Sequence, residues 1–133
     1  MKNCKKMDTL GINKELIERL FEQAKESPRL RMNYDLRTSS ADTSQRMLNA
    51  LLPGTEVPIH RHESTSETVV CLCGRLEELI YEVMPDGTFQ EVARHLLCPS
   101  EGKYGIQIPA GAWHTICVLE PSLIFEAKDG AYR

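Results

Sequence analysis

Two histidines separated by one residue, His60 and His62, are the pair whose type and spacing best suit chemistry. In an extended strand, residues i and i+2 point to the same face, with Cα atoms about 6.6 Å apart. Two imidazoles at that spacing can converge on one metal ion, although a single histidine on a strand is more often a core or surface residue. The His-x-His pattern therefore indicates a metal site that needs further ligands.

Glu67 and His114 are the candidates for those further ligands. Glu67 follows the polar, turn-prone segment 63–66 and opens a strongly apolar run, where a carboxylate needs a partner such as a metal cation. The alternative is a solvated glutamate at a strand edge. His114 follows segment 109–113, whose proline and glycine predict a tight turn that fixes where the next strand begins. The fourth histidine, His95, has no companion, and we expect it to be structural or exposed.

Three neutral imidazoles and one carboxylate suit Fe²⁺, Mn²⁺, Ni²⁺, Co²⁺, Zn²⁺ or Cu²⁺, and the ligand set does not choose among these ions. We therefore expect one divalent transition metal ion per chain. An octahedral ion with four protein ligands keeps two positions for water, substrate or dioxygen and acts as a Lewis acid. A tetrahedral Zn²⁺ site with the same ligands would be closed, which favours a structural role. The sequence offers no second titratable pair that reads as an acid and a base.

Five polar residues that precede the first histidine are candidates for substrate binding: Arg29, Arg31, Asn33, Arg46 and Asn49. A single arginine in a loop is usually solvated, but Asn49 lies in an apolar run, where an amide needs partners or a polar cavity. A regular strand directs Arg46 and Asn49 to opposite faces, and the sequence does not decide which one faces a pocket. Arg31 and Asn33 share a face if the chain is extended there. Because guanidinium groups bind carboxylate or phosphate, we expect a small anionic or polyhydroxylated ligand, such as a sugar phosphate or sugar acid.

The elements that must position these residues are one helix and a series of short strands. Residues 12–26 carry apolar side chains on one helical stripe, with Asn13 able to cap the start. Residues 29–45 predict a loop with at most one short strand. The remaining sequence alternates β-like runs with Gly, Pro or polar breaks, at 46–52, 55–62, 67–73, 75–83, 88–97, 105–108, 113–119 and 123–128. Seven or eight short strands predict an all-β sandwich or barrel, with residues 1–45 packing on a barrel of residues 46–133 in a single domain.

The composition fits one globular domain. The chain has 133 residues, of which 41% are hydrophobic and 26% charged, which argues against disorder or a coiled coil. The net charge of −3 leaves no electrostatic footprint for nucleic acid or an anionic membrane, and the basic cluster Lys2, Lys5 and Lys6 is short and terminal. No run approaches the roughly 18 apolar residues of a membrane span. Five cysteines, an odd number, and the lack of a signal-peptide pattern favour free thiols and a cytoplasmic location.

The spacing of the candidate ligands resembles the two motifs of the cupin superfamily. The first motif is Gly, five residues, His-x-His, three or four residues, Glu, six residues and Gly, and it is matched in full by Gly54, His60, His62, Glu67 and Gly74. The second motif centres on Pro-x-Gly-x-x-His, which segment 109–114 matches, although the usual upstream Gly is displaced and the usual downstream Asn is Val118. The resemblance implies a jelly-roll, or double-stranded β-helix, barrel with an N-terminal helix, and a metal ion on His60, His62, Glu67 and His114.

A closer resemblance, which covers most of the chain, is to the WbuC-type cupins, whose members often lie in polysaccharide gene clusters. It is carried by residues 31–36, 45–51, the first cupin motif, 108–115 and 125–132. It implies a metal-binding cupin that acts on a sugar, sugar phosphate or nucleotide-sugar in polysaccharide biosynthesis, by isomerisation or related carbonyl chemistry. Two alternatives remain open: an iron-dependent dioxygenase-type enzyme, and a non-catalytic barrel that binds or senses a small molecule.

The expected partners follow from these features. The ligand is a small anionic or polyhydroxylated molecule, and neither nucleic acid nor a membrane is expected. Cupin barrels commonly pair, and a sandwich with exposed edge strands gains from covering them. We therefore expect a homodimer with the N-terminal helix at or near the interface.

Overall fold

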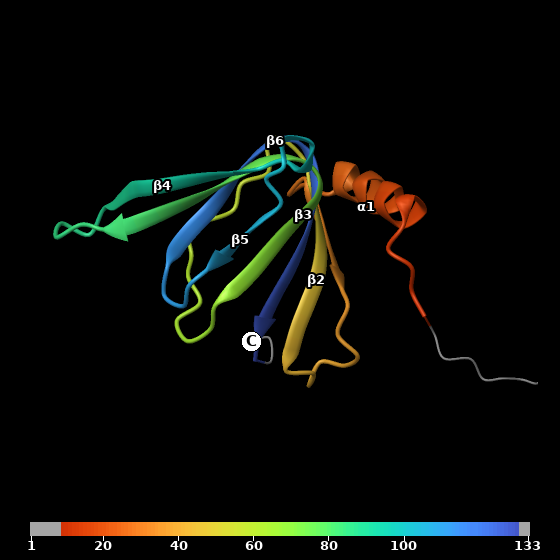
Figure 1. The fold of residues 1–133 in the computed structure, drawn as a ribbon, viewed down its shortest axis with the longest axis horizontal. Coiled ribbons are helices and arrows are strands. Elements are labelled where there is room, and N and C mark those ends of the chain that lie inside the picture. The colour runs from red at the N-terminus through yellow and green to blue at the C-terminus, as the bar shows by residue number, and fades with distance from the viewer. Residues whose placement is uncertain (1–8, 131–133) are drawn as a thin grey trace, which may run out of the picture.

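An α-helix packs on one side of an antiparallel sheet (Figure 1). The computed structural model describes residues 9–130, so the basic cluster Lys2, Lys5 and Lys6 lies outside the described residues. In chain order the elements are α1 (Lys14–Glu26), β1 (Arg31–Asp35), β2 (Ser44–Leu51), β3 (Glu67–Val83), β4 (Phe89–Leu97), the 3-10 helix η1 (Pro99–Glu101), β5 (Gly105–Ile108) and β6 (Trp113–Asp129).

Helix α1 forms where the apolar stripe predicts it, two residues shorter at its start. The side chain of Asn13 accepts a hydrogen bond from the Leu16 backbone N–H at 3.0 Å, which confirms the predicted N-cap. Ser27, in an extended conformation before Pro28, ends the helix. The stripe is buried against the sheet in a cluster made of Leu16, Leu20, Ala24, Leu48, Ala50, Leu52 and Leu123. The helix is therefore fixed to the sheet by apolar packing.

The strands form one antiparallel sheet in the order β1-β2-β6-β3-β4, with β5 also paired to β3. This arrangement confirms the predicted all-β fold with an N-terminal helix. Among the described strands the hydrogen-bonded ladder does not close into a ring, and β1 and β4 lie at its two ends. The sheet curves, so that the concave side between β2, β3 and β6 can enclose a pocket (Figure 1).

Two strands are much longer than predicted, and both bend. β3 runs through Gly74 and β6 runs through Pro121, where the sequence pattern predicted breaks. Gly74 has φ of 106°, and a Cβ there would overlap the Pro121 carbonyl and the Ser122 side chain. The register between β3 and β6 shifts on both sides of this point. The prediction of separate strands was wrong because this glycine and proline form bulges within paired strands, where they bend the sheet and do not end it.

The predicted strand at 55–62 is absent from the structure. Within that segment only His60 makes a β-bridge, to His114, and the rest has no regular structure. The segment is nevertheless held in place, since Thr115 Oγ1 donates to the Val57 carbonyl. Val57 of this segment lines the pocket on the concave side of the sheet. The two motif histidines therefore lie on a fixed loop beside β6.

The concave side of the sheet is apolar at one end and polar at the other. The apolar end is a second core cluster, made of Leu51, Val69, Cys71, Leu76, Leu97, Ile108, Val118 and Ile124. Alternation along the same strands brings Asn49, Glu67 and Glu126 to the polar end. The apolar cluster thus forms the floor beneath a polar pocket.

The helices and the cysteines bear on two expectations about the environment of the chain. None of the helices in residues 9–130 has the length and hydrophobicity that crossing a bilayer requires. Cys71, Cys73, Cys98 and Cys117 carry free thiols, and Cys4 lies outside the described residues. Burial raises the pKa of the Cys71 thiol to about 11, so this side chain behaves as a small apolar group.

Candidate metal centre and pocket

His60 and His114 are held opposite each other by the backbone. The N–H of His60 donates to the His114 carbonyl at 3.0 Å, and the N–H of His114 donates to the His60 carbonyl at 2.8 Å. A third bond, from the Gly111 N–H to the His62 carbonyl at 2.8 Å, fixes the other motif histidine. Gly111 adopts φ of 83° in the turn after Pro109, a conformation that favours glycine. The second motif therefore positions both ends of the His-x-His segment.

The three imidazoles converge on one point. Ligand atoms of His60, His62 and His114 all lie within 4.8 Å of one another, a separation that lets one metal ion contact all three. Nδ1 of His60 lies 2.9 Å from the Pro58 carbonyl, and Nδ1 of His114 lies 2.9 Å from the Ala112 carbonyl. Because a carbonyl oxygen only accepts, each Nδ1 carries the proton, and Nε2 keeps its lone pair for a metal.

Glu67, the first residue of β3, faces the imidazoles. Its Oε1 lies 3.4 Å from Nε2 of His114 and 3.5 Å from Nε2 of His62. Burial opposes ionisation of this carboxyl, but hydrogen bonds from His114 and Glu126 outweigh it and lower its pKa to about 2. The carboxylate is thus charged at neutral pH and close enough to complete the four-residue set that the sequence predicts.

The protonation of the histidines also suits metal binding. Burial lowers the pKa of both His60 and His62, which keeps these rings neutral. At His114 burial acts in the same direction, but hydrogen bonds to Glu67 and to the Ala112 carbonyl outweigh it and raise the pKa. A metal ion would take the place of the second proton that His114 can hold at Nε2, beside Glu67. The donor chemistry of the four residues therefore fits a divalent metal ion.

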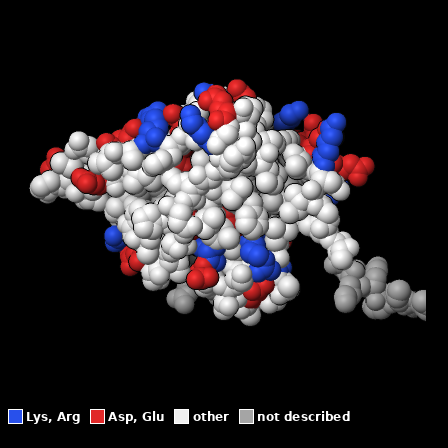
Figure 2. All heavy atoms as spheres, in the orientation of Figure 1, with Lys and Arg blue, Asp and Glu red and all other residues white. Residues whose placement is uncertain are grey.

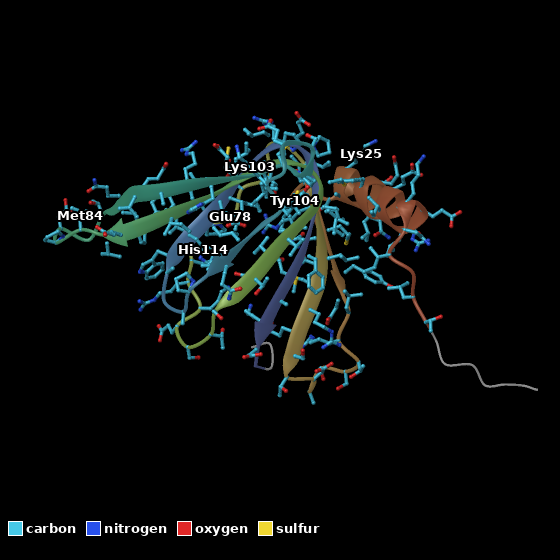
Figure 3. The ribbon with its side chains drawn as sticks, in the orientation of Figure 1. Lys25, Glu78, Met84, Lys103, Tyr104 and His114 are labelled. Carbon is cyan, nitrogen blue, oxygen red and sulfur yellow. The ribbon has the colours of Figure 1, made fainter. Side chains whose placement is uncertain are left out.

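The four residues open into a cavity of about 210 Å³ on the concave side of the sheet. Its lining comes from β1, β2, β3, β6 and the loops beside them: Arg29, Arg31, Asn33, Gln45, Met47, Asn49, Val57, His60, His62, Glu67, Glu78, His114, Ile116, Ile124, Glu126, Ala127 and Lys128. Figure 3 labels His114 and Glu78, which come from the neighbouring strands β6 and β3. In Figure 2 acidic atoms lie set back in the middle of this face, with basic side chains nearer its lower edge.

The structure separates the five candidate substrate residues into two groups. Arg46 does not line the cavity, whereas the other four do: Arg29, Arg31, Asn33 and Asn49. Arg46 lies on the other face of β2, where its guanidinium contacts Asp42 at 3.2 Å and the Leu36 carbonyl at 3.1 Å. The alternation that the sequence predicts thus holds, with Asn49 as the inward residue. Arg46 therefore lies outside the pocket.

Four polar pocket residues were missed by sequence reasoning: Gln45, Glu78, Glu126 and Lys128. Glu126 lies two residues after the buried Ile124, so strand alternation could have identified it as inward. Its pKa rises to about 8 because it is buried beside the Glu67 charge. Glu78 is 2% exposed, and burial together with the charges of Glu67 and Glu126 raises its pKa well above the usual value. The pocket therefore holds one charged carboxylate and two carboxyls that burial favours in the neutral form.

A family model described as "Domain of unknown function (DUF6016)" matches residues 12–93, which include α1, the His-x-His pair and Glu67. The chain belongs to the DUF6016 family. His114 lies beyond the matched residues of this DUF6016 chain. Among curated proteins, no sequence matches it.

Solved structures place the DUF6016 chain in the cupin fold. Oxalate oxidase in complex with the substrate analogue glycolate aligns at a TM-score of 0.61 and 13% identity, over 80% of this chain and 54% of that one. The capsular polysaccharide assembling protein CapF from Staphylococcus aureus aligns at 0.62 and 17%, over 80% and 30%. The cupin domain of Schizosaccharomyces pombe Cnp3 aligns at 0.52 and 12%, over 75% and 64%. The chain thus spans about half the length of oxalate oxidase, and identities this low show the fold alone.

Proposed function

We propose that this protein is a metal-dependent cupin that acts on a sugar, sugar phosphate or nucleotide-sugar, as the WbuC-type cupins it resembles are expected to do in polysaccharide biosynthesis. The observation that carries the proposal is the convergence of three histidines and Glu67 inside a cavity that also contains cationic side chains. The resemblance in fold to CapF, described as a capsular polysaccharide assembling protein, supports the substrate class.

The four residues proposed to hold the metal are His60, His62, Glu67 and His114. Their fit rests on the backbone carbonyls that fix Nδ1 of two of these rings and on the ionised Glu67. When bound, a divalent ion would supply Lewis-acid chemistry and orient oxygen groups of the substrate. The protein itself contributes neutral imidazoles and an apolar floor that excludes water from one side.

Cationic residues in the same cavity suit an anionic group on the substrate. Arg29, Arg31 and Lys128 all line it. Arg31 is held by hydrogen bonds to the Thr55 hydroxyl at 3.2 Å and the Glu56 carbonyl at 2.9 Å, both from Nη1, so its other guanidinium nitrogens remain for a ligand. A guanidinium fixed in this way can bind a carboxylate or phosphate with little loss of side-chain entropy.

The cavity volume favours a small substrate. Sites for drug-sized ligands usually measure about 300–1,000 Å³, and this cavity measures about 210 Å³. A single sugar unit suits this volume better than a whole nucleotide-sugar, whose nucleotide part would have to lie outside. We therefore favour a sugar acid or sugar phosphate within the proposed class.

The alternative of an iron-dependent dioxygenase-type enzyme is supported by the likeness in fold to oxalate oxidase. The identity of the bound metal separates the two proposals, since zinc or nickel in the active protein argues against dioxygen chemistry. A non-catalytic sensor would be favoured by a pocket that large side chains block, and the open cavity gives that reading less support.

The direct test is to load the purified protein with Fe²⁺, Mn²⁺, Ni²⁺ or Zn²⁺ in turn and to measure metal content and ligand binding. We expect about one ion per chain, and calorimetric binding of D-gluconate or D-glucose 6-phosphate that depends on that ion. The His114→Ala variant should lose both. The exposed His95, which does not line the cavity, provides the matched control as His95→Ala. Absence of metal after reconstitution would overturn the proposal.

We also propose that the protein is a homodimer with α1 at or near the interface. Leu10 and Ile12, just before α1, are 48% and 47% exposed, and burying such apolar side chains favours association. Light scattering at micromolar concentration should give about twice the chain mass of 15.1 kDa. A mass equal to that of one chain would rule the dimer out.

A further inference from the structure

Three buried acceptor atoms without partners lie in the same cavity. Among the described residues, the buried side-chain atoms that make no hydrogen bond are Oε1 of Gln45, Oδ1 of Asn49 and Oε1 of Glu78. All three residues line the cavity that contains the metal residues. Buried polar atoms are nearly always hydrogen-bonded in proteins, so three exceptions gathered in one pocket call for a ligand that supplies donors.

The orientation of the Gln45 and Asn49 amides follows from their other contacts. Gln45 Nε2 donates to the Gly130 carbonyl at 2.8 Å, which leaves Oε1 as the free acceptor. Asn49 Nδ2 lies 3.5 Å from Oε1 of Glu126, with Oδ1 free. The two residues are four apart on β2, so both side chains point to the concave side of the sheet. Gln45 is 7% exposed, which shuts its oxygen off from bulk water.

Glu78 supplies the third acceptor from β3. It is 2% exposed. Its strand, β3, pairs with β6, the strand that contains His114 (Figure 3). Among the described residues it forms no ion pair, so no cation compensates it there. A neutral carboxyl can accept a hydrogen bond at one oxygen and donate at the other, which suits a hydroxyl group in either direction.

We propose that Gln45, Asn49 and Glu78 form a hydroxyl-recognition site, which selects ligands with several hydroxyl groups along the carbon chain over ligands that carry only a metal-chelating group. This inference rests on the proposed function, because the metal holds one end of the ligand. Sites built to hydrogen-bond a hydroxyl reject analogues that lack it, since the buried acceptor then stays unpaired. The three residues would thus set specificity, while the metal and the cationic residues hold the acidic end.

The test compares two acids that share the same chelating group. D-Gluconate and 2-hydroxyhexanoate both carry an α-hydroxycarboxylate on a six-carbon chain, but only gluconate has hydroxyl groups on the remaining carbons. Calorimetry with the metal-loaded protein should show gluconate bound at least about tenfold more tightly, because it can pair the buried acceptors. Equal affinity for both acids would overturn the inference and leave the proposed function standing. Failure of both acids to bind would overturn the proposed function, and this inference with it.

Variants at Glu78 then assign the preference to the site. Glu78→Leu should weaken gluconate binding about tenfold and leave 2-hydroxyhexanoate unchanged, so that the preference falls. Glu78→Gln keeps a carbonyl acceptor and should retain most of the preference. The control is Glu77→Leu, since the neighbouring Glu77 faces the other side of β3 and pairs with Arg94 at 3.0 Å. A preference that survives Glu78→Leu and Asn49→Leu together would overturn the proposal.

A measurement without ligand provides a second readout. If Glu78 has no partner in the free protein, Glu78→Leu should leave the melting temperature of the metal-free protein unchanged or raise it. A buried polar group that is paired only when a ligand binds destabilises the ligand-free protein. A fall in melting temperature as large as that of a core deletion would show that Glu78 has a structural partner, and would overturn its assignment to the ligand.

Discussion

The two faces of β2 differ in how their side chains are satisfied. On the convex face, Leu48 and Ala50 are fully buried under α1, in a cluster that contains only apolar residues. On the concave face, Gln45 and Asn49 are buried or half-buried with oxygen atoms that have no partner. Because its side chains alternate between the two faces, β2 contributes to an apolar interface with α1 on one side and to a polar pocket on the other.

This difference teaches where stability and function are located. Apolar burial under α1 stabilises the fold without any polar requirement. The concave side contains unpaired acceptors and buried carboxyls, and these groups destabilise the protein when no ligand is bound. The same groups can form hydrogen bonds with a ligand. Substitutions on the convex side should therefore lower stability without weakening ligand binding. Substitutions on the concave side should weaken ligand binding without lowering stability.

The largest effect should come from the convex side. Leu20→Ala opens a cavity under α1, where Leu20 is 2% exposed, and should lower the free energy of unfolding by about 2–5 kcal/mol. Metal content per folded chain should not change, because no residue of this cluster lines the pocket. Urea unfolding and elemental analysis would measure both. The control is Glu18→Ala, on the exposed face of the same helix, which should lower the free energy of unfolding by less than about 0.5 kcal/mol. A loss of metal in Leu20→Ala would contradict the separation of the two faces.

The next effect should come from the proposed metal ligands. His114→Ala should weaken metal binding by about a hundredfold or more, since even residues that only orient a ligand contribute about 10–100-fold. Binding in the wild type should also weaken as pH falls below the usual histidine pKa of 6.5, with His114 protonated first because its pKa is raised. Titration with a competing chelator at several pH values would measure this. Metal affinity that did not change with pH would argue against histidine ligands.

A smaller effect should appear in the pH dependence of stability without metal. The pKa of Glu78 is raised well above 4.5 in the fold, so above that pH the unfolded chain loses a proton that the folded chain keeps. Stability from this group is complete below pH 4.5 and falls as pH rises, by about 1.4 kcal/mol per pH unit, until pH passes the folded pKa. Glu126, whose pKa is also raised, contributes a dependence of the same sign, so the comparison must be with Glu78→Gln. Relative to the wild type, that variant should gain stability steadily from pH 5 to pH 7 in urea unfolding, and a constant gap would contradict the prediction.

Features that depend on local spacing or on a motif were predictable from the sequence, whereas features that depend on contacts between distant strands were not. The helix stripe, its Asn13 cap and the cluster of three histidines were predictable because each depends on local spacing or on a motif. Glu78 was not predictable, since it is eleven residues from Glu67, and simple alternation would place the two on opposite faces. The bulges around Gly74 shift the register and bring both carboxyls to the concave side. The position of such bulges depends on contacts between β3 and β6, which are distant in the sequence.

The smallest effect concerns two of the arginines that the sequence names as candidates for substrate binding. Arg31 lines the pocket, whereas Arg46 lies on the other face of β2 and is bound to Asp42. Arg31→Ala should therefore weaken binding of D-gluconate to the metal-loaded protein by about fivefold, the modest value expected of a partly exposed charge. Arg46→Ala should leave that affinity unchanged, because its loss alters only contacts outside the pocket. Calorimetry at low and high salt would sharpen the comparison, since screening should reduce the Arg31 effect. An equal loss of D-gluconate affinity in both variants would mean that the arginines act through the overall charge of the protein. The position of a residue on one or the other face of β2 would then not decide whether it contributes to binding.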